Sequence, residues 1–92
     1  MQGAPITRPG EDLVRKGLSD LAAGKDSLEA LLVSIGSHRL REAGLPVPQA
    51  LPNPEHRLYL LLARTFGDDA HSRYNALIRR LVSFERALEC GI

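Results

Sequence analysis

The sequence predicts an all-α domain, built as a four-helix antiparallel bundle or as two packed helical hairpins joined by a Pro-rich connector. Apolar residues recur at spacings of three and four in four segments, which is the pattern of helices with one buried face. Glycines end three of these segments, at Gly24, Gly44 and Gly67. The chain of 92 residues suffices for one core. We therefore expect residues 10–92 to form a single domain behind a flexible tail at residues 1–9.

The first helix is expected from Glu11 to Ala23. Glu11 and Asp12 place negative charge in its first turn, where the helix dipole favours it. Its apolar face consists of residues at helical spacing, namely Leu13, Val14, Leu18, Leu21 and Ala22.

The second helix is expected to begin after Asp26 and to continue to Ala43. Asp26 and Glu29 have the spacing of a capping box, in which the first side chain accepts a backbone hydrogen bond. Gly36-Ser37 interrupts the apolar pattern, which predicts either a kink or a close crossing with another helix. Four prolines then follow in residues 46–54, so this connector is expected to be stiff and extended.

The third helix is expected from Pro54 to Phe66, with Asn53 as its N-cap. Its interior, residues 58–63, is apolar on nearly every side and contains no β-branched residue, which argues against a buried strand. A helix of this kind cannot lie on a surface with one face in water. We therefore expect it to be central in the domain or covered by a second chain.

The fourth helix is expected from about Asp69 to Glu89 and is the longest. Apolar residues spaced by four and three form a heptad-like seam along it, namely Ala70, Tyr74, Leu77, Leu81, Phe84 and Leu88. Such a seam packs efficiently against another helix of the same chain or of a second one.

Charge and cysteine content exclude several classes of protein. Twelve Lys and Arg residues against eleven Asp and Glu give a net charge of +1, which argues against coating nucleic acid through charge alone. One cysteine, Cys90, cannot form an intrachain disulfide and indicates a reducing, cytoplasmic location. We find neither a secretory leader nor an apolar run of bilayer length, so we expect no membrane association.

No metal or cofactor site is expected. The potential metal ligands are His38, His56, His71, Asp68, Asp69 and Cys90, and they form no close Cys/His pair and no HExxH motif. Asp68 or Asp69 is better explained as the N-cap of the fourth helix.

One pair of residues suggests catalysis. Arg64 and His71 are separated by six residues across the turn between the third and fourth helices, a spacing that resembles the loose Arg–His signature of the HEPN family of helical ribonucleases. The resemblance implies that His71 would accept the proton of an RNA 2′-hydroxyl while Arg64 stabilises the developing charge. The match covers two residues and the chain is shorter than that family's domain, so this stays a distant alternative.

A second alternative is a nucleic-acid-associated regulator that uses arginines on the last helix, namely Arg73, Arg79, Arg80 and Arg86. These occupy a broad arc without interleaved aromatic residues. A helix-turn-helix around Gly36 conflicts with Leu32 and Glu42, where the pattern requires a small and an apolar residue.

The favoured interpretation is a small protein-interaction or oligomerisation module without catalytic activity, most simply a two-fold homodimer. Two long apolar tracts, residues 31–35 and 58–63, offer more apolar surface than three neighbouring helices cover in a small domain. We expect the core and the self-association seam to use Leu58, Leu61, Leu62, Tyr74, Leu77, Leu81, Phe84 and Leu88.

Overall fold

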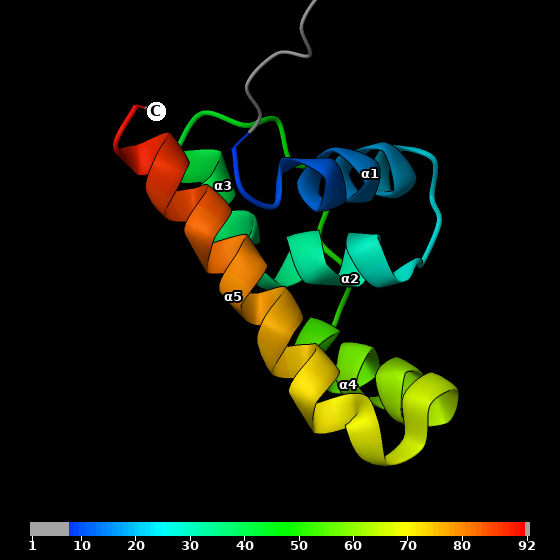
Figure 1. Cartoon of the computed structure of the whole chain (residues 1–92). Coiled ribbons are helices and arrows are strands. Elements are labelled where there is room, and N and C mark those ends of the chain that lie inside the picture. Colours follow the sequence, from blue (N-terminus) through cyan, green and yellow to red (C-terminus); the bar gives the residue numbers. More distant parts are fainter. Residues whose placement is uncertain (1–7, 92) are drawn as a thin grey trace, which may run out of the picture.

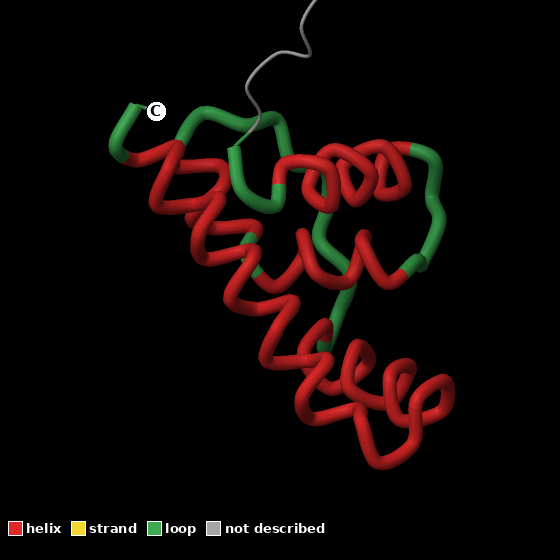
Figure 2. The backbone as a smooth tube through the Cα atoms, viewed as in Figure 1, coloured by secondary structure: helices red, strands yellow, loops and turns green. Residues whose placement is uncertain are grey.

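The computed structural model describes residues 8–91 and confirms the all-α prediction (Figures 1 and 2). No strand occurs within this range. Its helices are α1 (Glu11–Ala22), α2 (Leu28–Ile35), α3 (Ser37–Glu42), α4 (Pro54–Phe66), the short 3₁₀ turn η1 (Gly67–Asp69) and α5 (Ala70–Glu89). Residues 1–7 of the predicted tail lie outside the described range. Its end is tied to α1, because the backbone N–H of Arg8 donates to the Glu11 carboxylate at 3.1 Å.

The centre of the fold is α2, so of the two alternatives for the third predicted helix, a central position or cover by a second chain, the central position is wrong. Five consecutive residues of α2, Ala30 to Ser34, are buried. Helix α1 packs along one side of α2, and α4 and α5 contact it from other sides. Helix α4 lies at the lower end of the molecule in Figure 1, beside the first half of α5. One side of α4 therefore remains in solvent.

Close packing of α1 on α2 depends on Gly17. An added Cβ at this position would lie 2.9 Å from the carbonyl carbon of Glu29 and closer still to the Glu29 oxygen and a Val33 methyl. Only glycine allows the two backbones to approach this closely.

The second predicted helix is divided at Gly36 into α2 and α3. A Cβ on Gly36 would meet the Glu85 carboxylate and both Leu81 methyls of α5. Gly36-Ser37 was expected to mark either a kink or a close helix crossing. Both occur here, because the helix breaks at the point where α5 crosses it.

Of the predicted N-caps of α2 and α4, the first is wrong and the second is confirmed in position only. Ser27, not Asp26, caps α2: its Oγ accepts the Ala30 N–H at 3.1 Å. Asp26 instead forms an ion pair with Arg57 at 2.8 Å, which joins the α1–α2 loop to α4. Asn53 occupies the N-cap position of α4 with a left-handed φ of 48°, but its side chain makes no capping hydrogen bond.

The apolar seam of α5 faces the chain's own core. Ala70, Leu81 and Phe84 are buried, and the other three seam residues are half-buried against them. Helix α5 runs obliquely past α2, with α4 beside its first half and α3 beside its second half (Figure 1). Helix α2 packs against both α1 and α4, and α4 also packs against α5. None of the described helices is long and apolar enough to cross a bilayer.

Candidate interaction surface

Three large hydrophobic side chains are exposed in the described part of the chain, and all lie on α4. Tyr59 is 40% exposed, Leu60 46% and Phe66 37%. Helix α4 turns Leu58 and Leu62 into the core. Leu60 lies on the opposite side of the helix, whereas Tyr59 and Phe66 lie on the flank that contacts Tyr74 and Arg73 of α5, so the exposed apolar residues span an arc of about 120° around the helix. We call these three residues, together with half-buried Ala63, the α4 outer face. Clustering on one helix distinguishes them from the scattered apolar residues of an ordinary surface.

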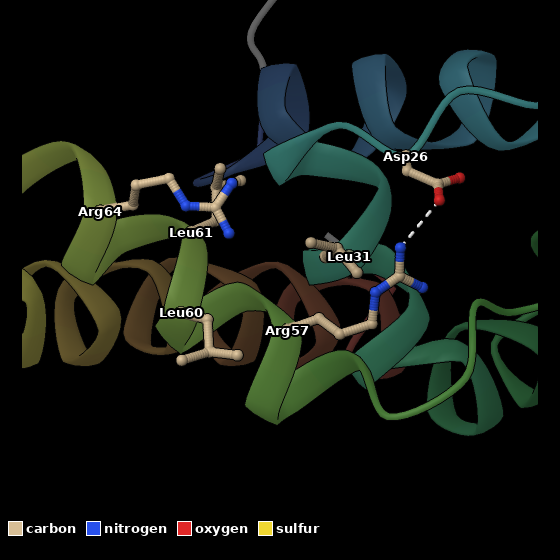
Figure 3. A pocket seen from close by; sticks show the side chains of 6 residues that line it. All are labelled: Asp26, Leu31, Arg57, Leu60, Leu61 and Arg64. Carbon is tan, nitrogen blue, oxygen red and sulfur yellow. Dashed lines mark hydrogen bonds and ion pairs between the residues drawn. The ribbon is translucent and has the colours of Figure 1, made fainter.

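A groove of about 190 Å³ runs between α2 and α4, on one flank of this face (Figure 3). Leu31, Leu60 and Leu61 supply its apolar lining. Arg57 and Arg64 lie at its two ends, seven residues apart and on the same side of α4. Asp26 holds Arg57, whereas Arg64 makes no ion pair with any described residue.

A second hollow of about 210 Å³ lies on the other flank, between α2, α4 and α5. Its lining consists of Leu28, Leu62, Phe66, Arg73, Ala76, Leu77 and Arg80. Arg80 binds Asp12 at 3.1 Å. The Arg73 guanidinium lies over the Phe66 ring, 4.0 Å from its centroid, in a cation–π contact. No described residue accepts a hydrogen bond from the guanidinium N–H groups of Arg73.

Two tyrosines, one from α4 and one from the first half of α5, also contact each other. The rings of Tyr59 and Tyr74 lie with centroids 5.8 Å apart and tilted by 58°. Burial raises the pKa of Tyr74, with the nearby charge of Glu55 adding to the effect, so its hydroxyl is neutral at physiological pH. This contact fixes the edge of the α4 outer face against α5.

Exposed charges of both signs border Phe66 at the junction of α4 and α5. We call residues 64–73 the α4–α5 tip. Asp68 and Asp69 are exposed, and Asp69 occupies the N-cap position of α5 without a side-chain capping bond. The predicted N-cap position is therefore confirmed at Asp69, but neither carboxylate makes the capping hydrogen bond. Neither makes a hydrogen bond or ion pair with a described residue.

The predicted catalytic pair does not form a shared site. Arg64 lines the groove between α2 and α4. His71 is exposed on the first turn of α5, where its Nε2 lies 3.2 Å from the Asn75 side-chain amide. No hydrogen bond joins Arg64 to His71. Residues 8–91 also contain no group of three or more side chains that could hold a metal ion.

The four arginines of the alternative nucleic-acid surface separate into two pairs. Arg73 and Arg80 line the hollow against α4. Arg79 and Arg86 are exposed on another side of α5 and make no ion pair with a described residue. Because Arg73 and Arg79 are six residues apart, they project about 120° from each other around the helix axis. The structure does not gather all four on one face.

The predicted association seam lies largely inside the monomer. Leu58, Leu62, Leu81 and Phe84 are at most 3% exposed, so a second chain cannot reach them. Leu61, Tyr74, Leu77 and Leu88 are half-buried and pack against this core. Sequence reasoning missed Tyr59, Leu60 and Phe66. Leu60 could have been identified by its position on the side of the third predicted helix away from Leu58 and Leu62, but Phe66 shares the side of Leu62, four residues before it, so periodicity does not show that it is exposed.

Comparison with protein-family models, curated proteins and solved structures finds no match for this chain.

Proposed function

We propose that this chain is a small helical protein-interaction module that forms a homodimer through the α4 outer face and has no catalytic activity of its own. The observation that carries the proposal is the location of all three exposed large hydrophobic residues of residues 8–91 on one helix. Association removes such a surface from water, with a gain of about 25 cal/mol per Å² of apolar area. A two-fold dimer is the commonest way in which a single chain covers its own surface.

The packing of the core supports the proposal that the α4 outer face is an interaction surface. Every buried side-chain nitrogen or oxygen in the described residues has a hydrogen-bond partner. Leu32, Leu40 and Leu58 are fully enclosed by their own chain. The described helices therefore enclose these side chains without a second copy. Exposed apolar side chains on α4 are then a feature of the surface and not a gap in the packing.

The proposed location is the cytosol. Cys90 is exposed and unpaired near the end of α5, and a free exposed thiol is suited to a reducing compartment.

Light scattering behind a sizing column, over a series of protein concentrations, tests the dimer. We expect the wild-type mass to rise from one to two chains with concentration. Replacing Leu60 and Phe66 together by glutamine removes the apolar contact and is expected to weaken dimerisation by about tenfold or more. Both positions are exposed, so circular dichroism is expected to show unchanged helix content.

The matched control is Ala22→Gln, which places glutamine on an exposed position of α1. We expect it to dimerise like the wild type. A wild-type chain that remains monomeric at every concentration contradicts the homodimer. A dimer that is unaffected by the Leu60 and Phe66 substitutions contradicts the assignment to α4.

A further inference from the structure

The α4–α5 tip carries charged groups that the chain itself does not use. Arg73 is exposed and its only described contact is the stack on Phe66. Asp68 and Asp69 follow Phe66 by two and three residues, are exposed, and neither cap α5 nor form an ion pair with a described residue. The positive end of the α5 dipole stabilises two acids here, but it uses none of their hydrogen-bonding capacity.

We propose that these charges set the register of the homodimer: a second copy docks on the tip so that Arg73 of each copy pairs with Asp68 and Asp69 of the other. This inference rests on the homodimer proposed above and names the contacts that orient it. Phe66 then lies close to the two-fold axis and contacts the same residue of the partner. Asp68 and Asp69 follow Phe66 by two and three residues, and Arg73 lies over the Phe66 ring.

Two-fold symmetry is the reason for choosing a second copy as the occupant. An isologous interface must be complementary to itself, so that residue i meets residue j of the partner and residue j meets residue i. The tip satisfies this condition because it presents unpaired charges of both signs beside an exposed aromatic ring. Stacking on Phe66 also holds the Arg73 guanidinium in place before association, which lowers the entropy lost on pairing.

The groove between α2 and α4 does not satisfy the same condition. Arginines stand at both of its ends, and its single acid, Asp26, is bound to Arg57. A two-fold contact centred there would place arginines opposite arginines, which is unfavourable. The axis is therefore expected at the tip, with Tyr59 extending the contact along α4.

Charge reversal tests this register. One variant carries Arg73→Glu and a second carries Asp68→Arg with Asp69→Arg. Each substitution acts at both symmetry-related pairs, so each variant alone is expected to raise the dimer dissociation constant by about tenfold or more. When the two variants are mixed, opposite charges meet at both pairs. Native mass spectrometry is then expected to show a heterodimer that exceeds both homodimers.

Arg79→Glu is the matched control, because Arg79 is also exposed on α5 and unpaired in the described residues but lies outside the tip. We expect its dissociation constant to equal that of the wild type, and we expect the wild-type constant to rise with salt. A wild-type dimer in which Arg73→Glu behaves like Arg79→Glu overturns the register and leaves the homodimer intact. A wild type that is monomeric throughout overturns the homodimer, and the register falls with it.

Discussion

Replacing Gly17 by alanine is expected to force α1 away from the central helix α2. An alanine methyl at this site would lie 2.9 Å from the carbonyl carbon of Glu29, whereas ordinary contacts begin near 3.4 Å. Its contacts with the Glu29 oxygen and the Val33 methyl are closer still. The Glu29 carbonyl belongs to the backbone of α2 and cannot rotate aside. The helices must therefore separate by more than half an ångström along their shared interface.

The expected loss of stability follows from two opposing effects. Alanine is a better helix former than glycine, which contributes about 1 kcal/mol of stability. Overpacking of a close-packed contact costs about 1–3 kcal/mol, and an immovable backbone neighbour places this site at the upper end. A separation of this size also weakens dispersion contacts along the whole α1–α2 interface. We therefore expect a net loss of about 1–2 kcal/mol, a substantial part of the stability of about 5–15 kcal/mol that a domain of this size has.

Urea unfolding followed by circular dichroism measures this loss directly. The midpoint is expected to fall while the slope of the transition stays constant, because the same surface is exposed on unfolding. Ala22→Gly provides a control for helix propensity at an exposed position in the last turn of α1. If Gly17→Ala is as stable as the wild type or more stable, the close approach of α1 to α2 is wrong.

Two further predictions concern buried carboxylates. Burial raises the pKa of Glu85 above its usual 4.5, against the opposing effect of Arg39, so its contribution to stability is largest at acid pH and falls as the pH rises through the folded-state pKa. Glu85→Gln is therefore expected to raise the thermal midpoint relative to wild type more at pH 7 than at pH 4, and an equal difference at both pH values would refute this. Hydrogen bonds from Lys16 and Ser27 lower the pKa of Asp20 below its usual 3.8, so its contribution is present above that value and is lost as the pH falls through the lowered pKa. Asp20→Asn is expected to lower the midpoint at pH 7 and to approach the wild type at strongly acid pH, and a constant difference between the two would contradict the ion pair.

Helix positions could be predicted from the sequence because local signals determine them. Gly24, Gly44 and Gly67 end helical segments as expected, each with a positive φ. Pro54 fixes the start of α4, and the 3.6-residue periodicity places α1 and α5 within a residue or two. These signals act within one turn of helix and need no knowledge of tertiary contacts.

The burial of each helix could not be predicted in the same way. Helix α4 is apolar on nearly every side, which indicated a central position, yet α2 occupies the centre. Glycines explain part of the difference, because Gly17 and Gly36 allow α1 and α5 to approach α2 closely. A close approach between segments that are distant in sequence leaves no periodic signal in either one.

The candidate site was missed for a related reason. Apolar seam residues were expected to serve both the core and the dimer, but a side chain enclosed by its own chain, such as Leu58, cannot contact a second one. The N-cap of α2 was assigned to the wrong residue for a similar reason. Asp26 is drawn to Arg57 across the fold, which leaves Ser27 to cap α2. Long-range ion pairs compete with local capping, and the sequence alone does not show which interaction is more favourable.

We propose that the α4 outer face and the α4–α5 tip join two copies of this chain. Sedimentation equilibrium of the wild type beside the Leu60 and Phe66 double-glutamine variant tests this association. We expect a reversible monomer–dimer equilibrium for the wild type and a shift toward monomer for the variant. A wild-type chain that sediments as a monomer at all concentrations, or two chains that dimerise equally, would contradict it.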